Sequence, residues 1–196
     1  MSKVIADITM SLDGFVTGPD PGPEQGLGRG GEPLHAWVMA GDSDVDADVL
    51  RESVEDTGAV ILGRNLFDVV DAPDGWSEDL GYGAEHAAQP PMFVVTHEAP
   101  EDVRLASLFT IVTEGLEAAV QAARAAAGDK DVYVMGGADV IRQLLALGLV
   151  DQLQLHLSPV LLGAGTRLFD GGEPTQLEQV DVRVSPHATH LTYVPA

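Results

Sequence analysis

The strongest constraint on the fold is a change of residue pattern within 131–148. Val132 to Met135 form a short apolar run with the length of a buried strand, and apolar residues then recur at helical spacing. Gly148 stands where a glycine is expected just after a helix. Only Gly136 and Gly137 separate the two patterns. A strand that turns directly into a helix is typical of α/β folds with a parallel sheet.

The rest of the chain alternates between strand and helix patterns and then ends in strands alone. Two segments rich in Gly, Pro and acidic residues, 11–33 and 71–91, are predicted to be irregular loops. Leu153, Leu155 and Leu157 alternate with polar residues, which predicts a strand with one covered face. We therefore predict a single α/β domain over 1–196, with a mostly parallel sheet, flanking helices and an antiparallel C-terminal edge. The predicted strands are 3–10, 58–63, 92–97, 108–113, 132–135, 152–157, 177–185 and 188–194, and the predicted helices are 34–41, 46–57, 64–68, 114–128 and 140–147.

The composition excludes several kinds of partner. The formal net charge of -21 repels nucleic acid and anionic membrane surfaces, so neither is expected to bind. No apolar run approaches the roughly 20 residues of a membrane-spanning helix, and no signal-peptide pattern opens the sequence. The chain has no cysteine, which excludes disulfides and thiolate metal sites and agrees with a cytoplasmic location. An anionic ligand would need backbone amides or a few placed cations.

Three predicted strands end in residues suited to phosphate. A helix that begins at a strand's carboxyl end directs its free N–H groups and its dipole into the crevice above the sheet. Gly136 and Gly137 would let this backbone approach a phosphate closely, although a tight turn with nothing bound needs the same residues. Arg64 follows a second strand, where it supplies a cation or forms an ordinary surface ion pair. A third strand ends in Thr96 and His97. Separate phosphate sites along one crevice indicate a dinucleotide.

Three segments of the chain, in their order, resemble the dihydrofolate reductase-like superfamily. They are MSLDGFVTG, VILGRNLFD and VYVMGGADVIRQLLALGLVDQLQLHLSPVLLGAGTRLF. Within the superfamily the chain is similar to the reductase domain of the bifunctional riboflavin-biosynthesis deaminase/reductase and its stand-alone relatives. This resemblance implies a central eight-stranded sheet, NADPH as the hydride donor, a homodimer, and a cis peptide at the double glycine.

The resemblance also implies roles for individual residues. The helix that follows the double glycine is expected to hold the cofactor pyrophosphate. The cofactor-binding residues implied are Gly136, Gly137, Ala138, Asp139 and Val140 for the pyrophosphate, Gly63, Arg64 and Asn65 for a second phosphate contact, Thr96 and His97 for the adenosine 2′-phosphate, Thr9 and Val16 beside the nicotinamide, and Thr113 near the adenine.

The chain departs from the family pattern where substrates are recognised. It lacks the paired cysteines of the zinc deaminase domain, so it supplies at most the reductase half. Folate reductases place an acidic residue where Leu34 stands, which argues against dihydrofolate as the substrate. Riboflavin-type reductases often carry a lysine where Phe15 stands, which weakens the match to a phosphorylated substrate.

Asp13, His35 and Trp37 are the candidates for the substrate side of the site. Asp13 is expected to touch substrate or assist proton delivery, or else to be a turn residue. His35 and Trp37 follow the predicted loop and would line the pocket, unless Trp37 belongs to the core. His156 and His190 show no spacing typical of a metal pair, and no metal site is expected.

The sequence thus predicts an NADPH-dependent reductase of a small heterocyclic or carbonyl compound. The alternative is a non-catalytic dimer that binds a nucleotide, because both expected substrate anchors are replaced.

Overall fold

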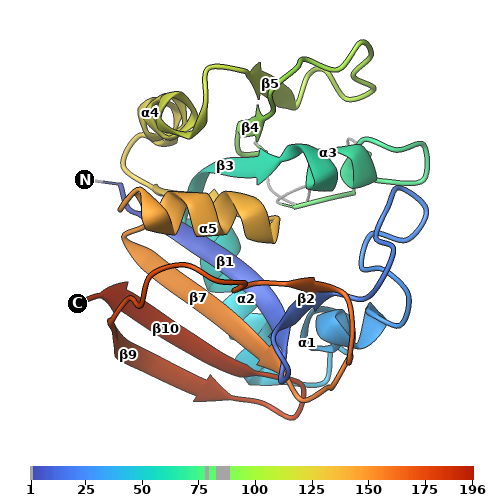
Figure 1. The fold of residues 1–196 in the computed structure, drawn as a ribbon, viewed down its shortest axis with the longest axis vertical. Helices are drawn as coiled ribbons and strands as arrows, with labels where there is room; N and C mark the ends of the chain where they lie inside the picture. The colour runs from blue at the N-terminus through green and yellow to red at the C-terminus, as the bar shows by residue number, and fades with distance from the viewer. Residues whose placement is uncertain (1, 78–79, 83–88) are drawn as a thin grey trace.

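The computed structural model describes residues 2–77, 80–82 and 89–196, so part of the predicted 71–91 loop lies outside the described residues. A sheet of eight strands in the order β5-β4-β3-β6-β1-β7-β10-β9 forms the centre of the molecule (Figure 1). The first six strands of this order are parallel to their neighbours, and β10 and β9 complete the sheet as antiparallel strands. The strands are β1 (Val4–Ser11), β3 (Thr57–Gly63), β4 (Met92–Val95), β5 (Phe109–Val112), β6 (Asp131–Val134), β7 (Gln152–Ser158), β9 (Leu177–Val184) and β10 (Thr189–Pro195). The predicted fold class is confirmed.

Helices cover both faces of the sheet. Val60 pairs with Tyr133 and Tyr133 pairs with Ile5, so these side chains share one face. Buried residues of α4 and α5 pack with those of the central strands on the opposite face. In Figure 1, α5 lies in front of the strands and α2 lies behind them. The helices are η1 (Glu32–His35), α1 (Ala36–Met39), α2 (Asp44–Asp56), α3 (Arg64–Val70), α4 (Leu116–Ala127) and α5 (Ala138–Ala146).

Local sequence signals account for the start of α2 and the end of α5. Ser43 caps α2, because its hydroxyl accepts a hydrogen bond from the amide of Asp46. Gly148 has a φ of 65° just after α5, as expected for a glycine that ends a helix. None of the helices in the described ranges has the length and apolar character needed to cross a membrane.

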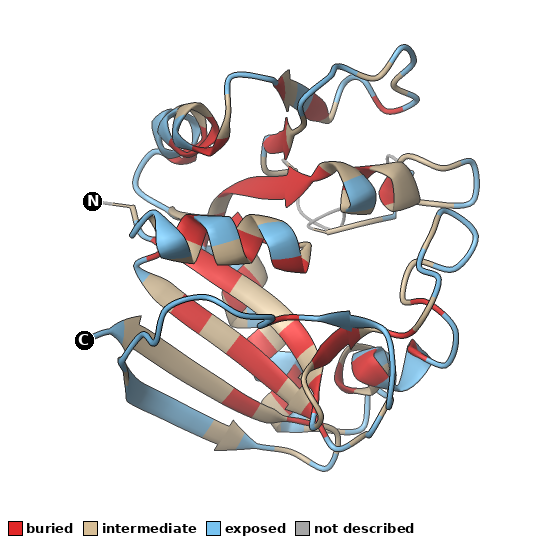
Figure 2. Ribbon diagram, viewed as in Figure 1, coloured by how far each residue is buried: buried red, intermediate tan, exposed pale blue. Residues whose placement is uncertain are grey.

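Two predictions about local structure were wrong, one for a loop and one for a strand. The segment 11–33 is not wholly irregular, since Phe15–Thr17 forms β2 and pairs with β8 (Thr166–Arg167) in a small second sheet. A strand of three residues has too little length to show periodicity, and its partner is distant in sequence. Strand β7 was predicted to have one covered face, yet His156 and Ser158 are each only 2% exposed. The segment η1–α1 covers the polar side of β7, where Trp37 packs against His156 and the hydroxyl of Ser158 donates to the carbonyl oxygen of Pro33. Strand β9 at the sheet edge is mostly exposed (Figure 2).

Candidate functional site

The Gly136–Gly137 turn joins β6 directly to α5, as the sequence predicts. Gly136 has a φ of 108°, a region that residues with a side chain rarely adopt. The peptide bond between the two glycines is cis, as the family resemblance implies. Gly137 has ordinary extended dihedrals (φ -74°, ψ -176°) and is the N-cap of α5. Only Gly136 therefore needs to be glycine for its backbone conformation.

The end of β3 lies against this turn. The amide of Gly63 donates to the carbonyl oxygen of Gly136 at 3.0 Å. A Cβ added to Gly63 would stand 2.7 Å from Cγ2 of Val140, so only a glycine allows β3 to approach α5 this closely. Asn65, in the first turn of α3, is exposed. The structure thus brings the first two predicted phosphate contacts, one at each strand-to-helix junction, next to each other.

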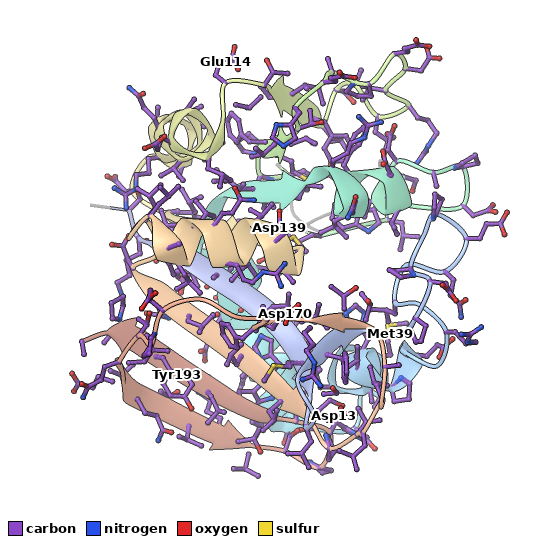
Figure 3. All side chains as sticks on the ribbon, in the orientation of Figure 1. Asp13, Met39, Glu114, Asp139, Asp170 and Tyr193 are labelled. Carbon is purple, nitrogen blue, oxygen red and sulfur yellow. The ribbon has the colours of Figure 1, made fainter. Side chains whose placement is uncertain are left out.

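The start of α5 fits an anionic group. No side chain caps this helix end, and a Cβ added to Gly137 would meet no heavy atom of the described chain within 4 Å. Asp139 does not block it, because its carboxylate accepts from Arg142 and from Gln143 one turn further along (Figure 3). Backbone N–H groups and the helix dipole favour an anion at such an end. The residues of this turn, Gly136 to Val140, could therefore hold a pyrophosphate.

The ends of β4 and β5 extend the same edge of the sheet. Thr96 donates its hydroxyl hydrogen to the carbonyl oxygen of Glu98 at 2.8 Å, and the exposed His97 lies between them in the chain. Arg64 reaches this strand end as well, because Nη1 donates to the same carbonyl oxygen at 3.3 Å while Nε is bonded to Asp68 at 2.7 Å. The sequence allows Arg64 either a phosphate contact or a surface ion pair, and the structure contains an ion pair with Asp68. It leaves the Arg64 side chain 40% exposed at the junction.

Thr113 follows β5 next to an acidic residue. The amide of Thr113 donates to the carboxylate of Glu114 at 2.9 Å, and its hydroxyl lies 3.4 Å from the same oxygen. Both residues are exposed beyond the end of the strand. Carboxylates here and at Glu98 add negative charge near the residues expected to face the adenosine phosphate.

Thr9 and Val16 lie at the carboxyl end of β1 and in β2. Both are 8% exposed. The hydroxyl oxygen of Thr9 accepts a hydrogen bond from Nε1 of Trp37 at 2.9 Å. Thr17, next to Val16, has a buried hydroxyl oxygen without a hydrogen-bond partner among the described residues. Such a hydroxyl could bind a polar group of a ligand, and no pattern in the sequence indicates that it is buried.

The three residues predicted for substrate have different surroundings. Trp37 is 7% exposed and packs in the core, in agreement with its alternative role. His35 is exposed at the end of η1, yet the protein around it lowers its pKa through partial desolvation and, to a smaller extent, through the nearby His156. Leu34 is fully buried where folate reductases carry an acid.

Asp13 connects two loops. Its carboxylate accepts hydrogen bonds from the hydroxyl of Ser11 and from the amides of Leu162 and Gly163. Ser11 and these amides lower the pKa of Asp13 to about 2, despite an opposing effect of desolvation. Figure 3 shows Asp13 well apart from Asp139 at the start of α5. The charged carboxylate thus holds the turn after β1 against the loop after β7.

The structure contains a buried polar cluster that the sequence patterns do not predict. Strands β7 and β10 place His156 directly opposite His190, and their Nδ1 atoms are 2.7 Å apart. Asp7 and Asp46 lie at the two outer ends of this pair. The signal that could have revealed it is the antiparallel register of two strands, which no short motif encodes. Among the described residues, no group of three or more His, Cys, Asp or Glu side chains is arranged to hold a metal ion.

Comparison with known proteins agrees with this fold. The chain is 23% identical over 188 residues to YyaP of Bacillus subtilis (strain 168), a match that covers 92% of this chain and 88% of the relative. A putative riboflavin biosynthesis protein from Shewanella sp. PV-4 has a similar structure, with a TM-score of 0.71, 20% identity and 99% of each chain covered. A pyrimidine reductase-like protein from Corynebacterium diphtheriae has a TM-score of 0.66 and 18% identity over 100% of this chain and 92% of its own.

A third structure relates the chain to a longer protein. RibD of Acinetobacter baumannii is matched with a TM-score of 0.62 and 18% identity, over 100% of this chain but only 58% of RibD. At these identities the solved structures show the common fold. The family described as the RibD C-terminal domain matches residues 2–191, nearly the whole chain. With its dihydrofolate reductase-like sheet and its glycine turn at the start of α5, the chain belongs to the RibD C-terminal domain family.

Proposed function

We propose that this protein is an NADPH-dependent reductase of a small heterocyclic or carbonyl compound. The observation that carries the proposal is the pair of adjacent strand-to-helix junctions at Gly63 and at Gly136–Gly137, with an open helix end at α5. Membership in a family of reductase-like domains supports it further. When bound, NADPH supplies a hydride to the substrate.

The chain's own residues would bind and orient the cofactor. The amides at the start of α5 would bind the pyrophosphate, and this binding requires no basic side chain. Arg64, Thr96 and His97 lie at the neighbouring strand ends, where a 2′-phosphate would distinguish NADPH from NADH. The buried Thr9 and Val16 would border the nicotinamide and limit the access of water to it.

The substrate side favours a neutral ring or carbonyl over a folate or a phosphorylated sugar. Leu34 is fully buried and offers no counter-charge to a protonated pterin. The ring of Phe15 is covered by the guanidinium of Arg167, which lies 4.4 Å from the ring centroid. That cation is also bonded to the carbonyl oxygen of Asp13, so it is already engaged.

We also propose that the chain forms a homodimer through β9. This edge strand carries Val182 and Val184 on one face, where they are 42% and 67% exposed, and Val180, at the irregularity of the pairing with β10, is 51% exposed. A row of exposed apolar side chains on a sheet edge is usually covered by a partner. A second copy of the same strand would cover it symmetrically.

Cofactor binding and turnover test the proposed function separately. Thermal-shift measurements with NADPH, NADH, flavins and pterins should show the largest stabilisation with NADPH, since a ligand that binds the native state raises the melting temperature. Oxidation of NADPH is then followed with a panel of small pyrimidines, pterins and carbonyl compounds. Binding without any oxidation would favour the alternative function, a nucleotide-binding dimer. No stabilisation by any nicotinamide nucleotide would refute both functions.

A further inference from the structure

Four ionisable side chains form a continuous row between the sheet and α2. Asp7 Oδ1 lies 3.2 Å from Nε2 of His156, the Nδ1 atoms of His156 and His190 are 2.7 Å apart, and Nε2 of His190 lies 2.7 Å from Oδ1 of Asp46. Both histidines are buried, with exposed fractions of 2% and 5%, and Asp46 is 3% exposed. The contacts between the two histidines and between His190 and Asp46 are therefore shielded from bulk water, whereas the side chain of Asp7 is 21% exposed.

The number of contacts determines the number of protons. Each of the three contacts needs one hydrogen, because two imidazole lone pairs or an imidazole lone pair and a carboxylate repel each other. Two neutral imidazoles and two carboxylates contain only two such hydrogens. The row therefore holds one additional proton. An imidazole is more basic than a carboxylate, so this proton belongs between the two Nδ1 atoms.

More carboxylates than cations surround the pair, and burial together with the charge of the other imidazole opposes a second additional proton. Asp7 faces the pair from β1 and Asp46 from α2. A polar cavity of about 70 Å³, away from the glycine turn, borders the pair and is lined by Glu52 and Asp56 of α2, Tyr133 of β6, and Asp181 and Arg183 of β9. Burial lowers the pKa of His190, and the charge of His156 adds to this effect, while the bond to Asp46 opposes it. His35 is the remaining titratable group near His156.

The pair is in direct contact with Trp37. The indole ring lies 4.3 Å from the ring of His156 and 5.2 Å from that of His190, measured between centroids. An aromatic ring attracts a cation on its face, so a charged pair holds the indole more firmly than a neutral pair would. Trp37 in turn donates its indole hydrogen to Thr9, beside the expected nicotinamide position.

We propose that His156 and His190 share one proton as a buried cation, and that this cation is a positioning element for Trp37 and Thr9 on the nicotinamide side of the site. The role in cofactor binding rests on the proposed function, whereas the shared proton does not. At high pH the proton is lost, the two Nδ1 lone pairs repel each other, and Trp37 loses its cationic support. Loss of the shared proton should therefore lower the affinity for the cofactor.

Nuclear magnetic resonance of the unmodified protein tests the proton directly. Long-range ¹H–¹⁵N spectra distinguish protonated from bare ring nitrogens, and the His156→Gln and His190→Gln variants assign the signals. At neutral pH we expect protonated Nε2 atoms on both rings and one further proton on, or averaged between, the two Nδ1 atoms. Only two protonated nitrogens in the pair would overturn the proposal.

Fluorescence of Trp37 tests the contact. The chain has two tryptophans, so the Trp76→Phe variant leaves Trp37 as the sole indole emitter. A protonated imidazole in contact with an indole quenches its emission. We expect weak emission at neutral pH that rises only in alkaline solution, and strong emission at neutral pH once His190→Gln is added. Emission already maximal at neutral pH in the Trp76→Phe protein would contradict a cationic pair.

The affinity for NADPH tests the positioning role. His190→Gln should weaken NADPH binding about fivefold and remove its decline in alkaline solution. His187→Gln is the matched control, because His187 bonds Asp42 at 2.6 Å between the same two parts of the fold but at the surface. It should leave both readouts unchanged. If the wild type binds no NADPH, the proposed function fails while the spectra still decide the shared proton. Equal losses in both variants would overturn the positioning role.

Discussion

Replacing Gly137 by alanine should separate cofactor binding from folding. The dihedrals of Gly137 suit any residue, and the added Cβ meets no heavy atom of the described chain within 4 Å. Alanine restricts the unfolded chain, which stabilises by about 0.4–1 kcal/mol, whereas alanine is a poorer N-cap than glycine by an amount of the order of 1 kcal/mol. These effects largely cancel. The melting temperature without ligand should therefore change by no more than about 4 °C.

The same methyl group stands where the pyrophosphate is expected to approach the backbone. We expect the NADPH affinity of Gly137→Ala to fall at least tenfold, or about 1.4 kcal/mol. Titration calorimetry measures this affinity, and calorimetric melting of the same sample measures stability. The prediction depends on the open space at Gly137, which a phosphate would fill and a Cβ would obstruct.

Gly136→Ala is the matched control for Gly137→Ala. Gly136 has a φ of 108°, so alanine is strained there by about 1–3 kcal/mol, while its Cβ would stand at an ordinary 3.5 Å from Ile8. This variant should lose stability. If Gly137→Ala instead lost stability and kept its affinity, the double glycine would be a tight turn and no phosphate site. That result would remove the main support for a dinucleotide enzyme.

Four further predictions concern selectivity, substrate, assembly and pH. His97→Ala should weaken NADPH binding more than NADH binding; equal losses in titrations would exclude His97 from the 2′-phosphate site. The purified protein should not reduce dihydrofolate at an appreciable rate, because Leu34 replaces the expected carboxylate; efficient turnover in a spectrophotometric assay would contradict this. Val182→Glu should convert a dimer into a monomer in sedimentation at micromolar concentration, and a wild type that is already monomeric would refute the β9 interface. Burial lowers the pKa of His190 in the folded protein. Below pH 6.5 the unfolded chain therefore binds a second proton at the His156–His190 pair more readily than the folded chain does, and the free energy of unfolding should decrease. Urea unfolding at several pH values should show this decrease, and it should be smaller in His190→Gln.

The elements could be predicted because their signals are local. Apolar strand runs, the alanine-rich α4 and the glycine after α5 are each visible within about a dozen residues. The ends of β3, β4, β5 and β6 could be placed together because parallel strands meet with their carboxyl ends at one edge. That is why the predicted phosphate residues lie next to one another in the structure.

Features that depend on distant pairing could not be predicted. β2 forms only because Phe15 meets Arg167 across the small second sheet. The sequence pattern predicts that His156 lies on the exposed face of β7, yet Trp37 of α1 covers it and the register places His190 opposite it. The bonds from Asp13 to Leu162 and Gly163 likewise join residues far apart in the sequence. No short segment contains both partners of such a contact.

The acidic composition explains why the backbone has the main part in the proposed phosphate site. With a net charge of -21 and only ten Lys and Arg residues, the chain has few cations, and the arginines near the site already have partners within it. Arg64 bonds Asp68, Arg142 bonds Asp139, and Arg167 covers Phe15 near the site. A side chain already bonded to a carboxylate attracts a phosphate less, because the local charges largely cancel.

Backbone amides have no such competitor. Their partial positive charge at the start of α5 persists whatever the net charge of the surface, since it comes from peptide dipoles. The surrounding field still repels an anionic cofactor over longer distances, and salt weakens that repulsion. Moderate salt should therefore accelerate NADPH association, which is the opposite of what a site built on basic side chains would show. Stopped-flow association rates at two ionic strengths measure the sign of this effect, and a rate that falls with salt would mean that side-chain cations such as Arg64 dominate the site.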